Sequence, residues 1–317
     1  MLTIATIGTS VITRSFADAV SRVPDVQIGS VYSRDAARAA AFAAELGVAD
    51  SESDLAALLA DPAIDAIYVA SPNSVHAAQA AQALRAGKHV IVEKPAVTEI
   101  DDWDELVALS KQHGVVLLEA IRTRFDPGLA AVRDVLPQLG QLRRVMLRYE
   151  KRSSRYDLVL AGETPNIFDP RLGGGALRDL GIYCIHALIA LVGAPESVVA
   201  AAVRLPTGAD GLGTIVGSYP GFIADLHFSK ITTPDQPSVI EGENGILMID
   251  EIDGPRTLTL VLNGAEPRTI VVEGPTNVLE SEVHRFAALV AGQDDPDADN
   301  AATRAALQLI EAAARAF

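Results

Sequence analysis

Short apolar runs alternate with helical patterns over the first 120 or so residues, and this alternation constrains the fold more than any other feature. Each run is rich in valine and isoleucine and apolar on both faces, which is typical of strands in a parallel sheet covered by helices. The runs are Leu2–Ile7, Val26–Tyr32, Ala66–Ala70, His89–Val92 and Val115–Leu118. Alanine-rich stretches such as 35–46 and 75–86 separate them. Repeated strand–helix units of this length predict a right-handed, doubly wound sheet.

The pattern changes near residue 122. Beyond it, a helix at about 126–136 and a strand at about 143–151 lead to a glycine-rich loop and a helix at about 176–192. From 197 to 272 the chain reads mostly as strands separated by turn sequences, and two helices end it. We therefore expect an α/β protein of two domains. The first is a Rossmann domain over residues 1–122, and the second is an α+β domain over residues 123–317 with a large, mainly antiparallel open sheet.

Charge and composition exclude several classes of protein. The chain has 26 basic and 41 acidic residues, a net charge of −15, which repels nucleic-acid phosphates and anionic membrane surfaces. No apolar run reaches the ~18 residues of a membrane span, and the first residues lack the basic start of a signal peptide. One cysteine, and six histidines without metal-ligand spacing, predict neither an internal disulfide nor a metal site. We expect a cytoplasmic protein with a small-molecule partner.

The first predicted strand ends in a degraded dinucleotide-binding fingerprint. That fingerprint, G-x-G-x-x-G/A, lets the backbone approach a pyrophosphate at the start of a helix. Here only Gly8 is present, and Ser10 and Thr13 stand in the other two places. Their hydroxyls can donate to phosphate, but their side chains narrow the approach, so an ordinary strand–helix turn remains an alternative.

The end of the second predicted strand favours NADP(H) over NAD(H). An NAD site places an acid here, about 20 residues after the loop, to bind the ribose 2′-hydroxyl. The chain instead has Ser33 and Arg34, with Arg38 one turn further on. A hydroxyl and guanidinium groups suit a 2′-phosphate, which an acid would repel. The alternative is that both arginines belong to a solvated helix start.

Three further segments carry a resemblance to a known family. They are S-P-N-S-V-H at 71–76, A-G-K-H-V-I-V-E-K-P at 86–95 and G-G-G-A-L-R-D-L-G-I-Y at 173–183. Together they resemble the glucose–fructose oxidoreductase and inositol dehydrogenase family of NAD(P)-dependent oxidoreductases. The E-K-P that ends a predicted strand is the most specific signal. Segments 119–125 and 173–183 are most similar to the dimeric dihydrodiol dehydrogenase branch.

The resemblance implies an active site and the chemistry of its residues. It assigns Lys94, Asp179 and Tyr183 to that site, and Tyr183 stands where many relatives have histidine. Asp179 and Tyr183 are four residues apart, so a helix would present both on one face, which His186 can join. Hydride transfer needs a group that exchanges a proton with the substrate oxygen, and either Tyr183 or His186 fits that task. The Lys94 ammonium can stabilise alkoxide charge and lower the pKa of the tyrosine.

The predicted site comprises two sets of residues. The catalytic candidates are Lys94, Asp179, Tyr183 and His186. The cofactor-binding candidates are Gly8, Thr9, Ser10, Val11, Ile12, Ser33, Arg34, Arg38, Ser71, Pro72, Asn73, His76, Glu93 and Lys94. His76 fits either a loop-fixing role or a contact with the nicotinamide. The resemblance also predicts a cis peptide bond between Lys94 and Pro95.

Basic side chains indicate where a substrate binds. Arg148, Lys151, Arg152 and Arg155 form a basic cluster in an acidic chain. The cluster is either a solvated strand end or a site for a carboxylate or phosphate. Arg122 stands where the dihydrodiol dehydrogenases have tryptophan, and an exposed guanidinium suits a sugar or an anion better than an aromatic diol. Arg122 and Arg152 are therefore the candidate substrate residues.

These features predict an NAD(P)-dependent oxidoreductase that transfers a hydride between nicotinamide and the CH–OH or carbonyl group of a sugar-like or diol substrate. The alternative is a non-catalytic, NAD(P)-sensing regulatory protein of the same fold. The joint presence of Lys94, Asp179 and Tyr183 favours the enzyme, because a sensor needs no proton-transfer group.

The strands predicted near 223–231 and 246–249 carry apolar residues on both faces, which indicates burial on two sides. We therefore expect a homodimer or higher homo-oligomer that associates through the sheet of the second domain.

Overall fold

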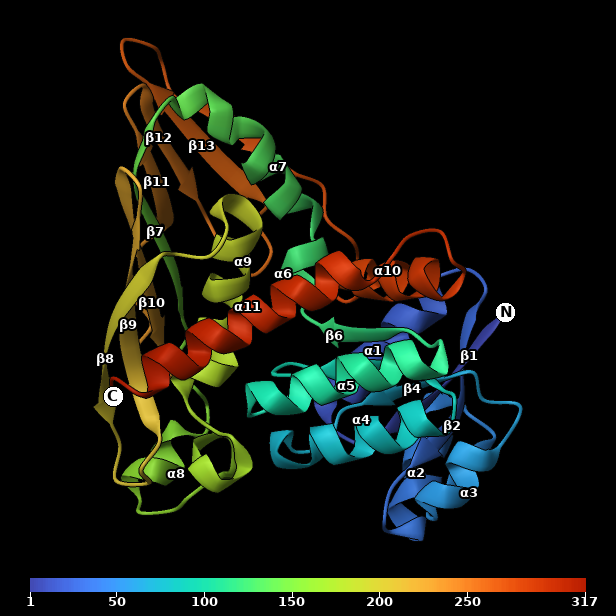
Figure 1. The fold of residues 1–317 in the computed structure, drawn as a ribbon. Coiled ribbons are helices and arrows are strands. Elements are labelled where there is room, and N and C mark those ends of the chain that lie inside the picture. The colour runs from blue at the N-terminus through green and yellow to red at the C-terminus, as the bar shows by residue number, and fades with distance from the viewer. The chain divides into compact units, whose positions relative to one another are not determined.

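The computed structural model describes residues 1–317, which form two compact units. The first unit comprises Met1–Ala120 and Pro275–Arg304, and the second comprises Ile121–Gly274 and Ala305–Phe317. Figure 1 labels their helices and strands along the chain. Each unit has its own sheet and is described by itself below.

The first unit contains a six-stranded parallel sheet with the order β3-β2-β1-β4-β5-β6. Its strands are β1 (Leu2–Ile7), β2 (Val26–Tyr32), β3 (Asp50–Glu52), β4 (Ala66–Val69), β5 (His89–Glu93) and β6 (Leu117–Ala120). Every residue of β4 and β6 is buried, as the unbroken apolar runs predict. The chain leaves β1 toward β2 on one side and reaches β4 on the other, so the switch point lies between the ends of β1 and β4.

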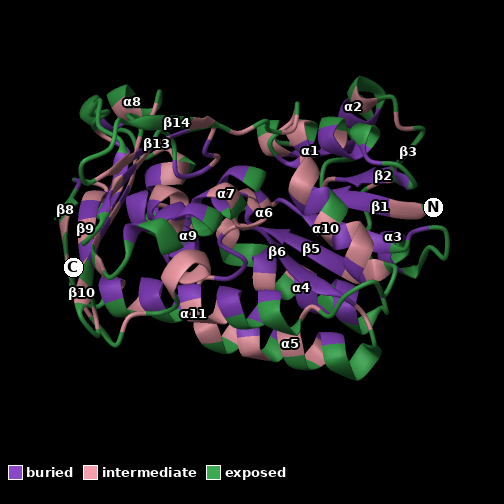
Figure 2. Ribbon diagram, turned by 90° about the horizontal axis from the view of Figure 1, so that it is seen from above, coloured by how far each residue is buried: buried purple, intermediate pink, exposed green.

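Helices cover both faces of this sheet. Figure 2 shows α1 and α2 on one side of the strands and α4 and α5 on the other, with their buried residues turned inward. The helices of this part of the chain are α1 (Val11–Arg22), α2 (Ala36–Leu46), α3 (Leu55–Ala60), α4 (His76–Arg85) and α5 (Ile100–His113). Local sequence sets their ends: the Asp35 side chain accepts from the Arg38 N–H at the start of α2, and Gly114, with φ of 64°, ends α5.

The first unit also includes a late segment that the sequence analysis assigns to the second domain. Helix α10 (Glu280–Val290) packs against α1, and Asn277 Nδ2 donates to the Ser15 carbonyl at 2.8 Å. The helix α11 (Asp297–Ala314) begins in the same unit, where Trp103 Nε1 donates to the Asn300 carbonyl at 3.2 Å. These two contacts join residues that are 262 and 197 positions apart, and no local sequence pattern predicts them. The expected boundary at 122 lies two residues beyond the division at 120, and residues 275–304 return to the first unit.

The second unit contains an eight-stranded sheet with the order β14-β13-β12-β11-β7-β10-β9-β8. All neighbours are antiparallel except β7 and β10. The strands are β7 (Leu142–Glu150), β8 (Ser197–Arg204), β9 (Asp210–Tyr219), β10 (Phe222–Ser229), β11 (Ser238–Gly242), β12 (Gly245–Ile249), β13 (Thr257–Leu262) and β14 (Arg268–Val271).

One hydrophobic core joins this sheet to the helices on one of its faces. Figure 1 shows α7 (Pro127–Val135) and α9 (Ile182–Val192) beside that face, and the last turns of α11 belong to the same core. Two short helices, α6 (Arg122–Phe125) and α8 (Tyr156–Leu160), complete the unit. Buried residues from the sheet and the helices form a single cluster, for example Leu226, Leu247, Ile185 and Ile310.

One segment of the second unit, Pro170–Val192, is long and apolar enough by length and composition to cross a membrane. The sequence analysis finds no apolar run of that length, because glycines and charged residues interrupt it. Within the structure 61% of its most apolar stretch is buried, and Ile182, Cys184 and Ile185 are fully covered. Its later part, from Ala176 into α9, packs within this core.

Candidate active site

The loop after β1 turns sharply at Gly8, whose φ is 119°. A Cβ atom here would lie 2.4 Å from the Ala70 carbonyl oxygen at the end of β4, so no larger residue fits. The Gly8 N–H donates to the Tyr32 carbonyl at 3.3 Å. Gly8 therefore lets the ends of three neighbouring strands approach one another at the switch point of the sheet.

Helix α1 begins directly after this loop, with Ser10 as its N-cap. Thr13 Oγ1 accepts from the Ser10 N–H at 3.4 Å and lies 3.3 Å from Ser10 Oγ. Thr13, which stands in the place of the third fingerprint glycine, is thus engaged in capping the helix. Val11 is 73% exposed, and its N–H belongs to the first turn, where helix N–H groups have no carbonyl partner. Such a helix start binds anions.

At the end of β2, two arginines are exposed and have no acidic partner. Arg34 and Arg38 make no ion pair in the structure. Two acids lie beside this strand end, Asp35 in the sequence and Glu52 opposite Tyr32 on β3, and both accept from backbone N–H groups: Glu52 from Ser53 and Asp54, and Asp35 from Arg38. The two guanidinium groups therefore remain available to an anion outside the chain.

Side chains of three neighbouring strands hold the E-K-P segment after β5. The Tyr68 hydroxyl donates to Glu93 Oε1 at 2.6 Å, and the Tyr68 ring stacks on Phe16 of α1, with 3.7 Å between ring centroids. Glu119 Oε1 accepts from the Ala96 N–H at 2.9 Å. The Lys94–Pro95 peptide bond is cis, as predicted. Lys94, which is only partly buried, thus projects from a backbone fixed on both sides.

His76 connects the E-K-P segment to the loop after β4. Its Nδ1 lies 3.0 Å from the Pro95 carbonyl oxygen and its Nε2 lies 2.7 Å from the Ser71 carbonyl oxygen. The side chain is fully buried, and burial lowers its pKa although both carbonyls favour the charged ring. Of the two roles left open by the sequence, this geometry fits the fixing of the loops. Ser71 Oγ in turn donates to Gln79 Oε1 at 2.6 Å, which holds Pro72 and Asn73 before α4.

Taken together, these residues fit a nicotinamide dinucleotide. The close approach at Gly8 brings the start of α1 to the switch point, where its N–H groups can receive a pyrophosphate. The unpaired Arg34 and Arg38 lie after β2, where the adenosine ribose binds in such folds. Segments 8–12, 71–73 and 93–94 all follow carboxyl ends of strands in this one sheet.

In the second unit, Asp179 and Tyr183 lie where a π-helix, η5 (Leu177–Gly181), runs into α9. The sequence predicts one continuous helix here, and the wider turn is a feature often found at functional sites. The Asp210 side chain accepts from the Leu177 N–H at 2.6 Å. Gly175 has φ of 141°, and a Cβ there would lie 2.1 Å from Asp210 Oδ1. The glycine run therefore lets a carboxylate cap the start of this helix.

A buried lysine, which the sequence analysis does not select, holds Asp179. Lys230, at the end of β10, places Nζ 2.6 Å from Asp179 Oδ2 and donates to the Ile167 carbonyl at 3.0 Å. Its side chain is 2% exposed and lies over the Phe168 ring. The buried Lys230 ammonium therefore fixes the partly exposed Asp179 carboxylate and neutralises its charge.

The Tyr183 ring lies between two other side chains. The Arg122 guanidinium carbon is 5.0 Å from its centroid, and the Tyr149 ring meets it edge-on at 5.1 Å with an interplanar angle of 85°. Arg122 forms an ion pair with Asp253, which precedes β13. Burial raises the pKa of Tyr149 above its usual range, and the Asp253 carboxylate adds to that rise.

Two expectations about substrate residues need correction. From the sequence we expect an exposed Arg122, but only 19% of its side chain is exposed and its guanidinium forms an ion pair with Asp253. Arg152 pairs with Asp157 at 2.7 Å and lies over the Tyr156 ring, because both acid and ring belong to the short helix that follows. Neither guanidinium is presented as a free anion site.

The remaining candidates on α9 are buried. His186, one turn after Tyr183, is 1% exposed and lies among apolar residues of the core. This position fits packing better than proton exchange with a substrate. Cys184 is fully buried as well, and burial raises the pKa of its thiol.

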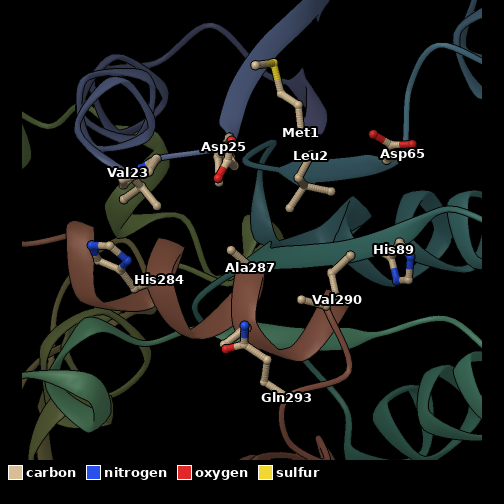
Figure 3. Close-up of a pocket in the computed structure, with 14 residues that line it drawn as sticks. Met1, Leu2, Val23, Asp25, Asp65, His89, His284, Ala287, Val290 and Gln293 are labelled. Atoms are coloured by element: carbon tan, nitrogen blue, oxygen red, sulfur yellow. The ribbon is translucent and has the colours of Figure 1, made fainter.

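A cavity of about 510 Å³ in the first unit lies elsewhere. Figure 3 shows it beside Leu2 at the start of β1, with His284 on α10, and with His89 at the start of β5. It therefore opens at the amino ends of the strands, opposite the loops that follow their carboxyl ends. None of the predicted site residues lines it.

Two family models match the chain. One, the oxidoreductase family with an NAD-binding Rossmann fold, covers residues 2–120, and the other, the GFO/IDH/MocA C-terminal domain, covers residues 135–248. The scyllo-inositol 2-dehydrogenase (NADP(+)) of Bacillus subtilis is 38% identical over 92% of this chain and 88% of that protein. The trans-1,2-dihydrobenzene-1,2-diol dehydrogenase of Mus musculus is 30% identical over 81% of this chain and 77% of that protein.

Solved structures show the same fold. The 3-ketoreductase KijD10 of Actinomadura kijaniata, in complex with NADP and TDP-benzene, matches with a TM-score of 0.89 at 23% identity, over 99% of this chain and 97% of that one. The predicted fold class, a Rossmann sheet followed by a large and mainly antiparallel sheet, is confirmed. The predicted resemblance is confirmed as well: the chain is an oxidoreductase that binds a nicotinamide cofactor and a small-molecule substrate, and it belongs to the GFO/IDH/MocA family.

Proposed function

We propose that this protein interconverts a secondary alcohol and a ketone on a cyclic polyol or sugar-like substrate, with NADP(H) as its cofactor. The observation that carries the reaction is the position of Asp179 and Tyr183, four residues apart, at the junction of η5 and α9. One is held by a buried ammonium and the other lies against a guanidinium. The 38% identity to a scyllo-inositol 2-dehydrogenase supports a cyclic polyol as the substrate class.

The preference for NADP(H) is supported by the end of β2. Arg34 and Arg38 are exposed and carry no ion pair, while the neighbouring acids Asp35 and Glu52 are engaged with backbone N–H groups. Guanidinium groups bind phosphate in a charge-assisted, often bidentate way. A 2′-phosphate thus meets two free cations here.

Each task of the proposed reaction is assigned to residues of this chain. The bound nicotinamide supplies or accepts the hydride. The loop 8–12 and segment 71–73 hold the cofactor, with Glu93 and His76 keeping their loops in place. Tyr183 exchanges a proton with the substrate oxygen, Lys94 stabilises negative charge on that oxygen, and Asp179 binds and orients a substrate hydroxyl.

The direct test is oxidation of scyllo-inositol and other cyclic polyols with NADP⁺, followed by NADPH absorbance. The reverse reaction is followed with the matching ketones. Turnover with at least one member of the panel, abolished in Tyr183→Phe, is expected. Tight NADPH binding without turnover on any cyclic polyol, sugar or diol would instead favour the sensing function.

We also propose that the protein forms a homodimer or higher homo-oligomer through the second unit's sheet. On the face opposite α7 and α9, directly paired residues form an apolar row across four strands: Val216, Met146, Val239 and Met248, interrupted by Asp225 on β10. Val199 of the edge strand β8 extends this row and is 68% exposed. A row of apolar side chains of this kind favours an interaction surface. A cytoplasmic location remains a prediction.

A further inference from the structure

Two side chains of the second unit contact the phenol ring of Tyr183, and a third is paired with one of them. Arg122, at the start of α6, places its guanidinium carbon 5.0 Å from the ring centroid, and Tyr149 of β7 contacts the ring edge-on. Arg122 Nη2 is paired with Asp253 Oδ2, and the Asp253 carboxylate helps to raise the pKa of Tyr149. A cation and an anion that are bound to each other therefore both lie near Tyr183.

The loop that carries Asp253 is fixed to the helices beside it. Thr123 Oγ1 donates to the Asp253 carbonyl at 3.0 Å, and Arg256 forms two hydrogen bonds to Asp126, at 2.7 and 2.8 Å. A Cβ at Gly128 would lie 2.0 Å from the Pro255 carbonyl oxygen, so backbone and helix are in contact there. The ion pair is thus held in place by contacts that do not involve Tyr183.

Burial makes these charges effective at short range. The side chains of Arg122 and Asp253 are only 19% and 9% exposed, so water screens them little. A cation near a phenol favours the tyrosinate form, and a carboxylate favours the neutral phenol. Consistent with such coupling, the negative charges of Tyr183 and Asp253 raise the pKa of Arg122 although burial alone would lower it.

Other titratable side chains lie near Tyr183 in the sequence of the same helical segment. Asp179 and Arg178 lie one turn earlier on η5, and His186 lies one turn later on α9. Asp179 is neutralised by Lys230 at 2.6 Å. Arg122 is the charged group that lies over the ring itself, and Asp253 is its ion-pair partner.

We propose that Arg122 and Asp253 are positioning residues that act on Tyr183 in opposite directions and together set the pH at which its hydroxyl exchanges a proton. This inference rests on the proposed role of Tyr183 as proton donor and acceptor. Arg122 favours the tyrosinate that accepts a proton from an alcohol. Asp253 keeps enough of the neutral phenol to donate a proton to a ketone.

The test follows the ionisation of Tyr183 directly. Tyrosinate ultraviolet absorbance is titrated in the intact protein and in Tyr183→Phe, and the difference between the two curves isolates Tyr183. The same subtraction is made for Arg122→Gln and Asp253→Asn, each with Tyr183→Phe added as its reference. Loss of Arg122 should shift the Tyr183 titration to higher pH by about one unit or more, and loss of the Asp253 charge should shift it to lower pH by a similar amount.

Two further variants separate charge from packing. Arg122→Lys should keep most of the wild-type titration because the positive charge remains, and the double variant Arg122→Gln/Asp253→Asn should return toward wild type because both charges are gone. In every variant, the pH at which turnover rises or falls should shift in the same direction as the Tyr183 titration curve. Circular dichroism checks that each protein is folded across the range.

Shifts in the same direction for both single variants, no shift in either, or no Tyr183 signal in Asp253→Asn before alkaline unfolding would overturn the inference. Because the titration needs neither cofactor nor turnover, it tests the ion pair even if the enzyme acts on another substrate. Opposite shifts with an unmoved rate profile would support the ion-pair effect and overturn Tyr183 as the proton-transfer group.

Discussion

Lys230 Nζ lies 2.6 Å from Asp179 Oδ2, and this contact joins the end of β10 to the π-helix that precedes Tyr183. The lysine also donates to the Ile167 carbonyl at 3.0 Å and is 2% exposed, whereas Asp179 is 37% exposed. The buried partner thus fixes a carboxylate whose other side is open. A group held in this way is oriented before a substrate arrives.

Lys230→Met keeps the length of the side chain but removes its charge, and we expect it to lower both stability and turnover. Breaking a buried ion pair leaves Asp179 and the Ile167 carbonyl without this donor, which costs about 1–3 kcal/mol for a pair that is only half buried. Chemical denaturation and steady-state kinetics measure the two effects. The matched control is Arg171→Met, since Arg171 also pairs with an aspartate but is 83% exposed and should be neutral. Equal effects of both variants would contradict a specific role for Lys230.

Local patterns predict the elements of the site better than they predict its partners. The strands that end at Ile7, Tyr32 and Glu93 lie where the apolar runs place them, and the E-K-P segment follows its strand. The three-residue β3 is missed because Asp50, Ser51 and Glu52 are all polar.

Contacts between distant residues could not be read from the sequence. Lys230 falls at the end of a predicted strand and Asp253 in a turn sequence, and neither pattern points to Asp179 or Arg122, their partners in the fold. Arg122 was expected to be exposed for the same reason, because its acid lies 131 positions away. Residues 275–304 were assigned to the wrong unit because their partners, Ser15 and Trp103, come early in the chain.

Arg34→Ala should reduce the preference for NADPH over NADH. Arg34 is exposed and has no ion pair, so the substitution removes a ligand for the 2′-phosphate without breaking a contact within the protein. One charged hydrogen bond corresponds to about tenfold or more in affinity. Fluorescence titration with both cofactors measures the change, and Arg34→Ala/Arg38→Ala should lower NADPH affinity further. Unchanged NADPH affinity in the double variant, or tighter NADH binding by the wild type, would refute the assignment.

His76 should make the protein less stable in mild acid. Burial lowers its pKa below the ordinary value of 6.5, so the unfolded chain binds a proton that the folded chain resists. The free energy of unfolding should therefore fall as the pH drops below about 6.5 toward the folded-state pKa. His76→Gln should flatten this dependence, although His89 and His227, whose pKa values burial also lowers, retain part of it. Urea unfolding at several pH values tests this, with the exposed His113→Gln as control. Identical slopes in His76→Gln and wild type would rule His76 out as a contributor.

Met248→Lys should dissociate the proposed oligomer. Met248 is the last residue of the apolar row, directly opposite Val239 on one side and Thr259 on the other. A lysine there would bury an uncompensated charge in an interface, which is costly. The control is Thr269→Lys on the edge strand β14, which pairs with Thr259 on the same face. Light scattering at micromolar concentration should give a smaller mass for Met248→Lys than for the wild type, and an unchanged mass for Thr269→Lys. A wild-type monomer would refute the oligomer itself.

Tyr183→Phe and Lys94→Ala should reduce turnover far more than they reduce cofactor affinity. The first removes only a hydroxyl, and the loss of a positioned acid costs about 10²–10⁴-fold in rate. The second removes an ammonium from a backbone that Glu93, His76 and Glu119 already fix, and the loss of one such stabilising charge costs about 10²–10³-fold. If both residues serve the same proton-transfer step, the double variant should lose much less than the product of the two single effects. His186→Asn is the comparison for the proton role, because His186 follows Tyr183 by one turn but is 1% exposed. If Tyr183→Phe is active while His186→Asn is folded but inactive, the histidine is the proton-transfer group. If both variants are fully active, the proton comes from a different source.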